Sequence, residues 1–480
     1  MSILEGLEPG KVLYYFEELT KIPRGSGNEK AVSNFLRHFA EERGLEVIQE
    51  ENMNIIIKKP GTRGYEGSSP VILQGHMDMV NEKNNDTVHD FMKDPLKLKL
   101  VGDDLYATGT TLGADNGIAI AFALSILDSD TAIHPPLEVL FTVEEETGLI
   151  GAQAVDGNQF QGKTLINIDS EEEGVFFVSC AGGARQSVRL PLSYSEGRGK
   201  AYLINLVGLK GGHSGLDIKM ERGNSIKLLG RVLYYLAKEV DFTLTSLKGG
   251  LKNNAIPREA EAVLVFPDLP VNLAEKVKSI EILLGDEIKT QDGGLRILLE
   301  EVSLPERTYD KETTKKAIEL LFLLPDGVVS NSHDIEGLVE TSLNLGVLHE
   351  SEDHLNYEFA VRSSVRSKKE MMLDKVQLLG EKYGATAITT SSYPEWSYAR
   401  ESKVRDTFVR VYKEKYGTEP SVAAIHAGLE CGILAGRIEG LDMISIGPNL
   451  YDVHTPNEHM SISSVKNVYE FLLEALIELK

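Results

Sequence analysis

The chain has 480 residues, too many for one ordinary hydrophobic core, so two or three domains are expected. Its composition, 42% apolar and 26% charged, is typical of a globular protein, and its net charge of −23 argues against nucleic acid or an anionic membrane as a partner. Two cysteines, Cys180 and Cys431, exclude a disulfide framework and a thiolate zinc cluster. The N-terminus reads as an amphipathic helix rather than a signal peptide, and no apolar stretch reaches membrane-spanning length, which predicts a cytoplasmic protein.

The N-terminal part predicts two helices followed by strands, and the third strand leads into His76 and Asp78. Residues two apart on an extended backbone point the same way, so these side chains project together past the strand end. In metal sites a carboxylate beside a histidine fixes the tautomer and orientation of the ring. The pair alone is weak evidence, so further ligands are needed downstream. The expected helices cover residues 11–21 and 28–43, the strands cover 45–49, 54–58 and 71–74, and an edge hairpin begins at 96–101.

Acidic residues recur at the ends of the next predicted elements. Asp115 lies between glycines at the start of an apolar helix, as a helix cap or as a ligand. The apolar strand 137–143 ends in three successive glutamates, and the strand 164–168 delivers Asp169. In open α/β sheets the ligand crevice lies at the carboxyl ends of the strands, so these side chains are expected to meet there.

From residue 186 to about 392 the pattern changes to an α+β alternation that suggests two helix-on-sheet units. After about residue 398, a helix, a strand at 443–446 and a final helix at 465–479 return to the earlier style. We therefore predict an α/β protein in which a discontinuous catalytic domain, residues 1–185 plus 395–480, carries an inserted lid or dimerisation domain, residues 186–394. The insert is expected to contain strands at 201–209, 260–266, 295–300, 340–348, 355–363 and 385–391, and helices at 224–240, 273–284, 313–323 and 368–383.

A last loop offers His454, Glu458 and His459, which completes a set of candidate metal ligands. Two imidazoles and three carboxylates suit zinc, cobalt or manganese. With one carboxylate shared, five ligands hold two ions about 3.5–4 Å apart, the spacing of hydrolytic two-metal sites. A second glutamate beside a metal-bound one suits a general base. The candidates are His76, Asp115, Glu145 or Glu146, Asp169 and His454.

The strings GHMD, GADNG, EEETG, NID and HTPNEH, in this order, resemble the di-zinc peptidase clan of carnosinases, aminoacylases and glutamate carboxypeptidase. Within that clan the chain is most similar to the bacterial aminoacyl-histidine dipeptidases, through GLKGGHSGLDI, NNAIP, HAGLECGIL and the long insert. The resemblance spans nearly the whole chain, and its metal motifs are specific.

The resemblance implies a role for each metal-site residue. His76 and His454 would each complete one metal site, Asp115 would bridge both ions, and Glu146 and Asp169 would supply the remaining carboxylates. Asp78 would orient His76, Glu145 would be the general base, and the Asp115–Asn116 peptide would be cis. The triple glutamate leaves a slip of one position, with Glu144 as the base, open.

The resemblance also implies substrate contacts. His213 would help to stabilise the oxyanion, across a dimer interface or after domain closure, although alone it reads as a turn histidine. Asn254 and Arg362 would hold the substrate, including its carboxylate, although Arg362 alone could equally be a surface ion-pair residue. Gly428 and Glu430 would line the substrate side, with Glu430 near a free α-amine.

The function implied is a cytosolic metallodipeptidase that cleaves short unblocked peptides, with Xaa-His and β-Ala-His among its substrates. It would use two divalent ions, zinc first and cobalt or manganese otherwise, and would form a homodimer through the insert. Alternatives with the same metal chemistry are a tripeptide aminopeptidase and an N-acyl-amino-acid amidohydrolase. A non-catalytic binding protein on a hydrolase scaffold is a further alternative, against which the complete ligand set argues.

Overall fold

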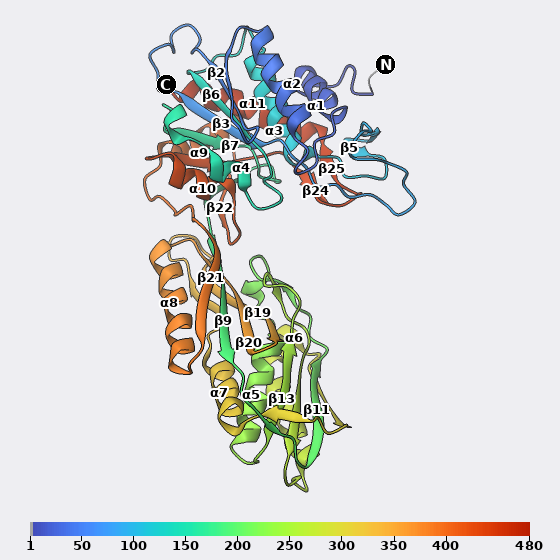
Figure 1. Cartoon of the computed structure of the whole chain (residues 1–480). Coiled ribbons are helices and arrows are strands. Elements are labelled where there is room, and N and C mark those ends of the chain that lie inside the picture. Colours follow the sequence, from blue (N-terminus) through green and yellow to red (C-terminus); the bar gives the residue numbers. More distant parts are fainter. Residues whose placement is uncertain (1–2) are drawn as a thin grey trace. The chain divides into compact units, whose positions relative to one another are not determined.

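The computed structural model describes residues 3–480, and the chain forms two compact units. The first unit comprises Met1–Cys180, Tyr398–Ala424 and Leu429–Lys480, and the second comprises Ala181–Ser397 and Ile425–Gly428. The blue to teal N-terminal segments and most of the red C-terminal segments in Figure 1 thus belong to one unit, and the green to orange segments form most of the other. Helices and strands mix in both units, so the predicted α/β class is confirmed.

The first unit is built on an eight-stranded sheet in the order β1-β2-β6-β3-β7-β23-β8-β22. Its centre is parallel: β3 pairs in parallel with β6 and β7, and β7 pairs in parallel with β23. Parallel neighbours end at the same edge, so the segments that follow β3, β6 and β7 begin side by side. The strands are β1 (Glu46–Gln49), β2 (Ile55–Lys59), β3 (Val71–His76), β6 (Leu137–Thr142), β7 (Thr164–Asn167), β8 (Val175–Cys180), β22 (Ser421–Ile425) and β23 (Asp442–Ser445).

Helices cover this sheet, and the one that matters most for the site is α3, which packs against α1 and β3. Alanine, isoleucine and leucine occupy all sides of α3, and nearly every one of its residues is buried, which holds its N-terminus firmly against the sheet. The helices of this unit are α1 (Gly10–Thr20), α2 (Lys30–Glu42), α3 (Ala114–Leu127), α4 (Ile150–Ala154), α9 (Lys403–Tyr416), α10 (Glu430–Arg437) and α11 (Ile462–Glu478).

A small second sheet fixes the C-terminal loop of the first unit. Strands β24 (Leu450–Tyr451), β25 (His459–Ser461), β5 (Asp104–Ala107) and β4 (Leu98–Val101) lie in that order. The predicted edge hairpin is therefore the β4–β5 pair, and it also accepts β25, with the rings of Tyr106 and His459 stacked at 4.5 Å between centroids. This pairing anchors residues 452–458, which carry His454 and Glu458, to the N-terminal part of the chain.

The second unit contains one nine-stranded sheet, with β16-β11-β15-β13-β19-β20-β9-β21 in order and β18 paired to β19. The two expected helix-on-sheet units are joined in this sheet, because Gly249 of β13 pairs with Leu348 of β19. The strands are β9 (Gly182–Pro191), β11 (Lys200–Val207), β13 (Thr243–Gly249), β15 (Ala260–Phe266), β16 (Arg296–Val302), β18 (Gly327–Asn331), β19 (Val339–Ser351), β20 (His354–Ser363) and β21 (Thr386–Tyr393).

The helices of the second unit are α5 (Ser225–Ala237), α6 (Leu273–Asp292), α7 (Lys311–Leu323) and α8 (Arg366–Lys382). Helix α6 runs past the predicted end at residue 284, because Gly285 lies within the helix and the polar residues after it continue the helix along the surface. Across residues 3–480, no helix combines the length and apolar character that crossing a membrane would require.

Candidate metal centre

Two histidines face the two oxygens of one carboxylate. Asp115 Oδ1 lies 3.1 Å from His76 Nε2, and Asp115 Oδ2 lies 3.1 Å from His454 Nε2. His76 ends β3, Asp115 lies in the first turn of α3, and His454 belongs to the loop before β25. Three segments far apart in sequence therefore place Asp115 between two imidazoles, the position of a carboxylate that bridges two ions.

Each histidine also has a carboxylate of its own. Asp169 Oδ1, just past β7, lies 3.4 Å from His76 Nε2, and Glu146 Oε1, just past β6, lies 2.9 Å from His454 Nε2. His76, Asp115 and Glu146 offer ligand atoms that all lie within 4.8 Å of one another. The five candidate ligands thus form two half-sites that share Asp115.

Asp78 connects His76 to the glutamate turn. Its Oδ1 lies 3.3 Å from His76 Nδ1, and its two oxygens accept the backbone N–H groups of Glu145 at 3.0 Å and Glu146 at 3.2 Å. The Ser26 hydroxyl donates a further bond of 2.7 Å. Burial disfavours the charged carboxylate, but these bonds, led by the one with His76, hold the pKa of Asp78 below its usual value. Asp78 is therefore a buried anion that is held in place beside the imidazole of His76.

The peptide between Asp115 and Asn116 is cis, which confirms that expectation. The Asn116 side chain accepts the His76 backbone N–H at 3.2 Å and donates to the Ile168 carbonyl at 2.6 Å. This amide ties the start of α3 to the ends of β3 and β7, from which His76 and Asp169 project. The three segments are thereby held in register.

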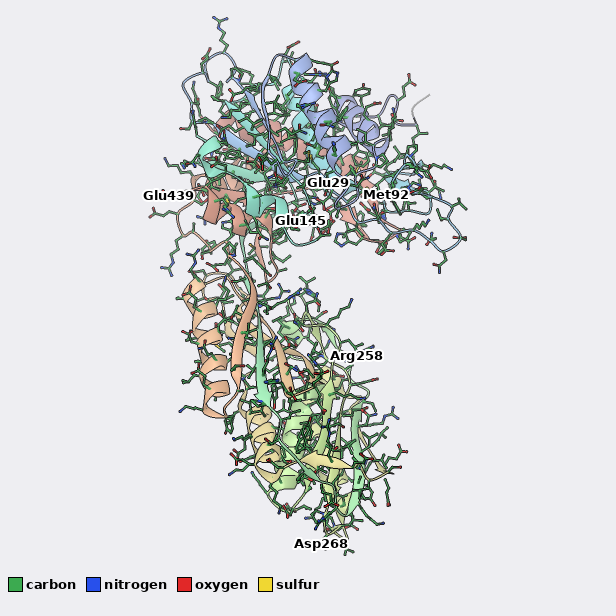
Figure 2. The ribbon with its side chains drawn as sticks, in the orientation of Figure 1. Glu29, Met92, Glu145, Arg258, Asp268 and Glu439 are labelled. Carbon is green, nitrogen blue, oxygen red and sulfur yellow. The ribbon has the colours of Figure 1, made fainter. Side chains whose placement is uncertain are left out.

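The three glutamates after β6 have different surroundings. Glu144 has a left-handed φ of 49°, and its N–H donates to Glu29 at 3.1 Å; Glu29 and Glu145 lie in the same part of the first unit (Figure 2). The carboxylate of Glu146 contacts His454. Burial raises the pKa of Glu145 well above its usual value, because the nearby charge of His76 offsets this only in part. Glu145 is thus the desolvated acid of the turn, and Glu146 the one that faces a histidine.

The cluster holds more buried acid than its histidines neutralise. Burial raises the pKa of Asp169 to about 6 against the opposing effect of His76, and burial raises the pKa of Glu171 to about 7. Hydrogen bonds to Asp115 and Glu146 raise the pKa of His454 to about 11. Closely packed carboxylates and imidazoles of this kind fit borderline divalent cations, which would neutralise the surplus negative charge.

Glu430, the first residue of α10, is fully buried beside this cluster. Its Oε2 accepts bonds from Gln74 at 2.5 Å and Thr142 at 2.8 Å, while its Oε1 has no hydrogen-bond partner among residues 3–480. Burial raises the pKa of Glu430 to about 7. A substrate amine would therefore have to reach the buried Oε1.

In the second unit, His213 lies in β12 (Gly212–His213), and its ring is held by the turn that follows. Its Nδ1 accepts the N–H groups of Gly215 at 3.3 Å and Leu216 at 3.1 Å, so the neutral ring carries its proton on Nε2. Burial, aided by the charge of Arg362, lowers the pKa of His213 and favours this neutral form. Asn254 lies on the exposed turn before β14 (Ala255–Ile256), and its carbonyl accepts the Ser214 N–H at 2.9 Å.

Arg362 lies on β20 of the second unit, where its Nη1 donates to the Tyr393 hydroxyl at 3.0 Å. The buried Nε of Arg362 has no partner among the described residues. Gly428 packs against the same tyrosine, because a Cβ there would lie 2.8 Å from its ring. His426, left unassigned from the sequence, is buried, bonds Ser342 at 2.8 Å, and has its pKa lowered to about 3, by burial first and then by Arg362 and His213.

Three residues that touch the surroundings of the candidate ligands were not predicted to do so: Arg24, Ser26, which was expected only as a helix cap, and Glu458, which was noted only as a member of the last loop. Arg24 and Ser26 lie in the PRGSG segment between α1 and α2, a polar stretch that reads as a simple connection. For Glu458, the sequence indicated a place near the site only through its position four residues after His454 in the same loop. Their partners lie too far along the chain for spacing to show.

Comparisons with known proteins show which family and fold the whole chain resembles. The model of peptidase family M20/M25/M40 matches residues 72–478. The chain is 38% identical over 482 residues to the cytosol non-specific dipeptidase of Escherichia coli (strain K12), across 100% of this chain and 99% of that protein. The crystal structure of aminoacylhistidine dipeptidase from Vibrio alginolyticus matches with a TM-score of 0.94 and 36% identity, across 99% of this chain and 98% of that one. A tripeptidase from Staphylococcus aureus shares the fold, with a TM-score of 0.55 and 17% identity, across 98% and 99%.

Proposed function

The chain belongs to peptidase family M20/M25/M40, and we propose that it is a metal-dependent dipeptidase that cleaves unblocked dipeptides, Xaa-His among them. The observation that carries the proposal is Asp115, whose two oxygens face His76 and His454. The two full-length relatives named above, a non-specific dipeptidase and an aminoacylhistidine dipeptidase, support the substrate class. The name of the first relative also supports a cytosolic location.

The proposed metal ligands form two half-sites around Asp115. His76 with Asp169 would hold one divalent ion, and His454 with Glu146 would hold the other. When bound, such a pair of ions acidifies a water molecule and polarises the scissile carbonyl. The ligand chemistry favours zinc, with cobalt or manganese as alternatives.

Glu145 is proposed as the general base. It takes a proton from the attacking water at its carboxylate and delivers that proton to the nitrogen of the leaving amino acid. Its backbone N–H is fixed by Asp78, which also fixes His76, so one buried carboxylate positions both the base and a ligand. This shared anchor keeps the base at a constant place relative to the metal site.

The second unit is proposed to bind substrate. The Nε2–H of His213 is the donor for the oxyanion, because the Nδ1 of that ring is occupied by backbone N–H groups. The fork of Arg362, oriented by Tyr393, binds the C-terminal carboxylate, and Asn254 holds the peptide beside it. Gly428 gives the substrate side its shape, Glu430 meets the α-amine, and a homodimer forms through this unit.

A dipeptide panel tests the proposal. The metal-free protein is assayed with Ala-His, β-Ala-His, Gly-Leu, Ala-Ala-Ala and N-acetyl-Ala, with and without added zinc, cobalt or manganese. Glu145→Gln is expected to abolish the metal-restored cleavage of dipeptides, whereas the matched control Glu144→Gln, one residue earlier in the same turn, should retain it.

Other outcomes have definite meanings. Activity that is independent of metal, or retained in Glu145→Gln, would refute the mechanism. Cleavage of the tripeptide or the acetylated substrate alone would keep the metal centre and identify a tripeptide aminopeptidase or an N-acyl-amino-acid amidohydrolase. A protein that binds peptide and metal but hydrolyses nothing would be a binding protein on this scaffold.

A further inference from the structure

A buried arginine joins two of the segments that carry the candidate ligands. Arg24 is 1% exposed, and its Nη1 donates to the carbonyls of Met77 at 2.9 Å and Asp78 at 3.1 Å. Its Nη2 donates to the carbonyl of Gly113, immediately before α3. One guanidinium thus connects the chain just after His76 to the chain just before Asp115.

A buried glutamate binds the same turn, but it accepts backbone N–H groups, whereas the arginine donates to backbone carbonyls. Glu458 is 2% exposed, and its Oε2 accepts the N–H groups of Leu112 at 2.8 Å and Gly113 at 3.1 Å. Its Oε1 accepts the N–H groups of Ala114 at 2.8 Å and Asp115 at 3.4 Å. Four successive N–H groups around the start of α3 therefore converge on one carboxylate, which comes from the loop that also carries His454.

The two side chains carry opposite charges. Arg24 is buried, which lowers its pKa to about 10, and the nearby carboxylates of Glu458, Asp78 and Asp115 oppose that lowering. A buried guanidinium without partners would be strongly unfavourable, whereas here its Nη atoms donate to three backbone carbonyls. The glycines on either side of Asp115 follow from this packing, because a Cβ at Gly113 or Gly117 would lie 2.5 or 2.6 Å from Arg24 Nη2.

We propose that Arg24 and Glu458 form a clamp that positions Asp115 between His76 and His454, so that the shared carboxylate is held ready for two metal ions. Neither side chain touches the reacting atoms, and both act through the backbone at residues 77–78 and 112–115. The inference rests on the proposed metal centre. It adds that the affinity of that centre depends on two residues that are not ligands. Removing hydrogen-bond partners behind metal ligands typically weakens metal binding about 10- to 100-fold.

Glu458→Gln tests the clamp with little change of shape. The amide retains one acceptor oxygen, but its NH₂ group then faces two backbone N–H donors. The matched control is Asp103→Asn: Asp103 also accepts an N–H, that of Ser463 at 3.0 Å, together with the hydroxyls of Ser461 and Ser463, at the start of α11 in the same unit. Both changes convert a carboxylate that binds the start of a helix into an amide. Within residues 3–480, however, Asp103 makes no hydrogen bond or ion pair with a candidate metal ligand.

Zinc affinity is the readout. Metal-free wild-type, Glu458→Gln and Asp103→Asn proteins are titrated with zinc against a chromophoric chelator, and the thermal unfolding of each metal-free protein is recorded. We expect zinc binding to weaken about 10- to 100-fold in Glu458→Gln and to stay at the wild-type value in Asp103→Asn. Equal affinities in the three proteins would overturn the clamp, as would equal losses in both variants.

Arg24→Lys provides a second variant in case Glu458→Gln does not fold. Lysine keeps the buried charge but cannot span the three carbonyls, so it should show weaker zinc binding in a folded protein; wild-type affinity would overturn the proposal. A wild-type protein that binds no zinc would refute the metal centre itself, and with it the clamp. The failure of the clamp and the failure of the proposed function are thereby distinguishable.

Discussion

Replacing Arg362 with methionine should remove the discrimination of the enzyme between a free and an amidated C-terminus. In the structure, the guanidinium is oriented by the Tyr393 hydroxyl at 3.0 Å, and its buried Nε has no partner among residues 3–480. A buried donor without a partner is costly, so a ligand that supplies an acceptor gains correspondingly. In the proposed complex, the substrate carboxylate supplies that acceptor.

The magnitude follows from that contact. Hydrogen bonds to charged groups contribute about 1.5–3 kcal/mol, which corresponds to a loss of about 10- to 150-fold in kcat/KM for Ala-His in Arg362→Met. Tyr393→Phe removes only the bond that orients the guanidinium, so a loss of about 2- to 10-fold is expected. Both losses should lie mainly in KM, because the carboxylate takes no part in the bond change and keeps its charge from the bound substrate to the transition state.

The assay compares Ala-His with its C-terminal amide on wild-type, Arg362→Met and Tyr393→Phe proteins. The wild type should prefer the free acid by about the factor that Arg362→Met loses, and in Arg362→Met the two substrates should become nearly equal. An equal loss on acid and amide would refute the reasoning, since it would show that the substitution disturbs the second unit generally rather than a contact with the carboxylate.

Three further predictions concern packing, metal and pH. Gly428→Ala should raise KM in the same direction as Tyr393→Phe, because its Cβ would press on the Tyr393 ring; an unchanged KM in steady-state assays would contradict the packing. Zinc at 100 times the dissociation constant of a site should stabilise the first unit by about 2.7 kcal/mol for each ion bound, seen in calorimetry as a rise of about 5–10 °C per ion in its transition; an unmoved transition would contradict a metal centre there. Lys227 donates to the carbonyls of Leu321 and Phe322 at the end of α7, and burial, only partly offset by Asp326, lowers its pKa from 10.5 to about 8. Between pH 8 and 10.5 the unfolded chain therefore binds one more proton than the folded chain at this position, so the free energy of unfolding of the wild type relative to Lys227→Met should rise by about 3 kcal/mol across that range. Denaturant unfolding measures this difference, with the single tryptophan, Trp396, as the probe of the second unit. A difference that does not change with pH would contradict the lowered pKa of Lys227.

Strand periodicity predicted much of the first unit because its functional residues lie at the ends of apolar strands. His76 and Asp169 follow β3 and β7, and parallel pairing brings such ends together irrespective of the loops between them. The role of Asp115 was less certain from the sequence, because an aspartate at the start of a helix can be either a helix cap or a metal ligand. Its two oxygens contact two histidines that lie far from it in sequence, and only the tertiary structure reveals such contacts.

Arg24 and Glu458 were beyond prediction for a different reason. Their partners are backbone groups, and backbone groups carry no residue identity that a sequence pattern could reveal. The continuity of the nine-stranded sheet in the second unit was not predicted either, since one pairing, Gly249 with Leu348, decides whether its strands form one sheet or two. Sequence therefore indicated the residues that bear the chemistry, whereas the residues that position them depend on the three-dimensional structure.

The two half-sites differ in how firmly their histidines are held, because one histidine lies in the loop after β24. His76 is 1% exposed and sits at the end of a central strand, whereas His454 is 47% exposed and has a left-handed φ of 62° in a loop. That loop also carries Glu458, so opening it would withdraw one ligand and the clamp carboxylate together. In the proposed centre, an ion held by His454 and Glu146 would therefore dissociate first, and its departure would leave Asp115 less firmly held for the second ion. We therefore expect zinc to be released to a chelator in two steps, with the first ion leaving from the half-site in the loop. Release in a single step would contradict this expectation.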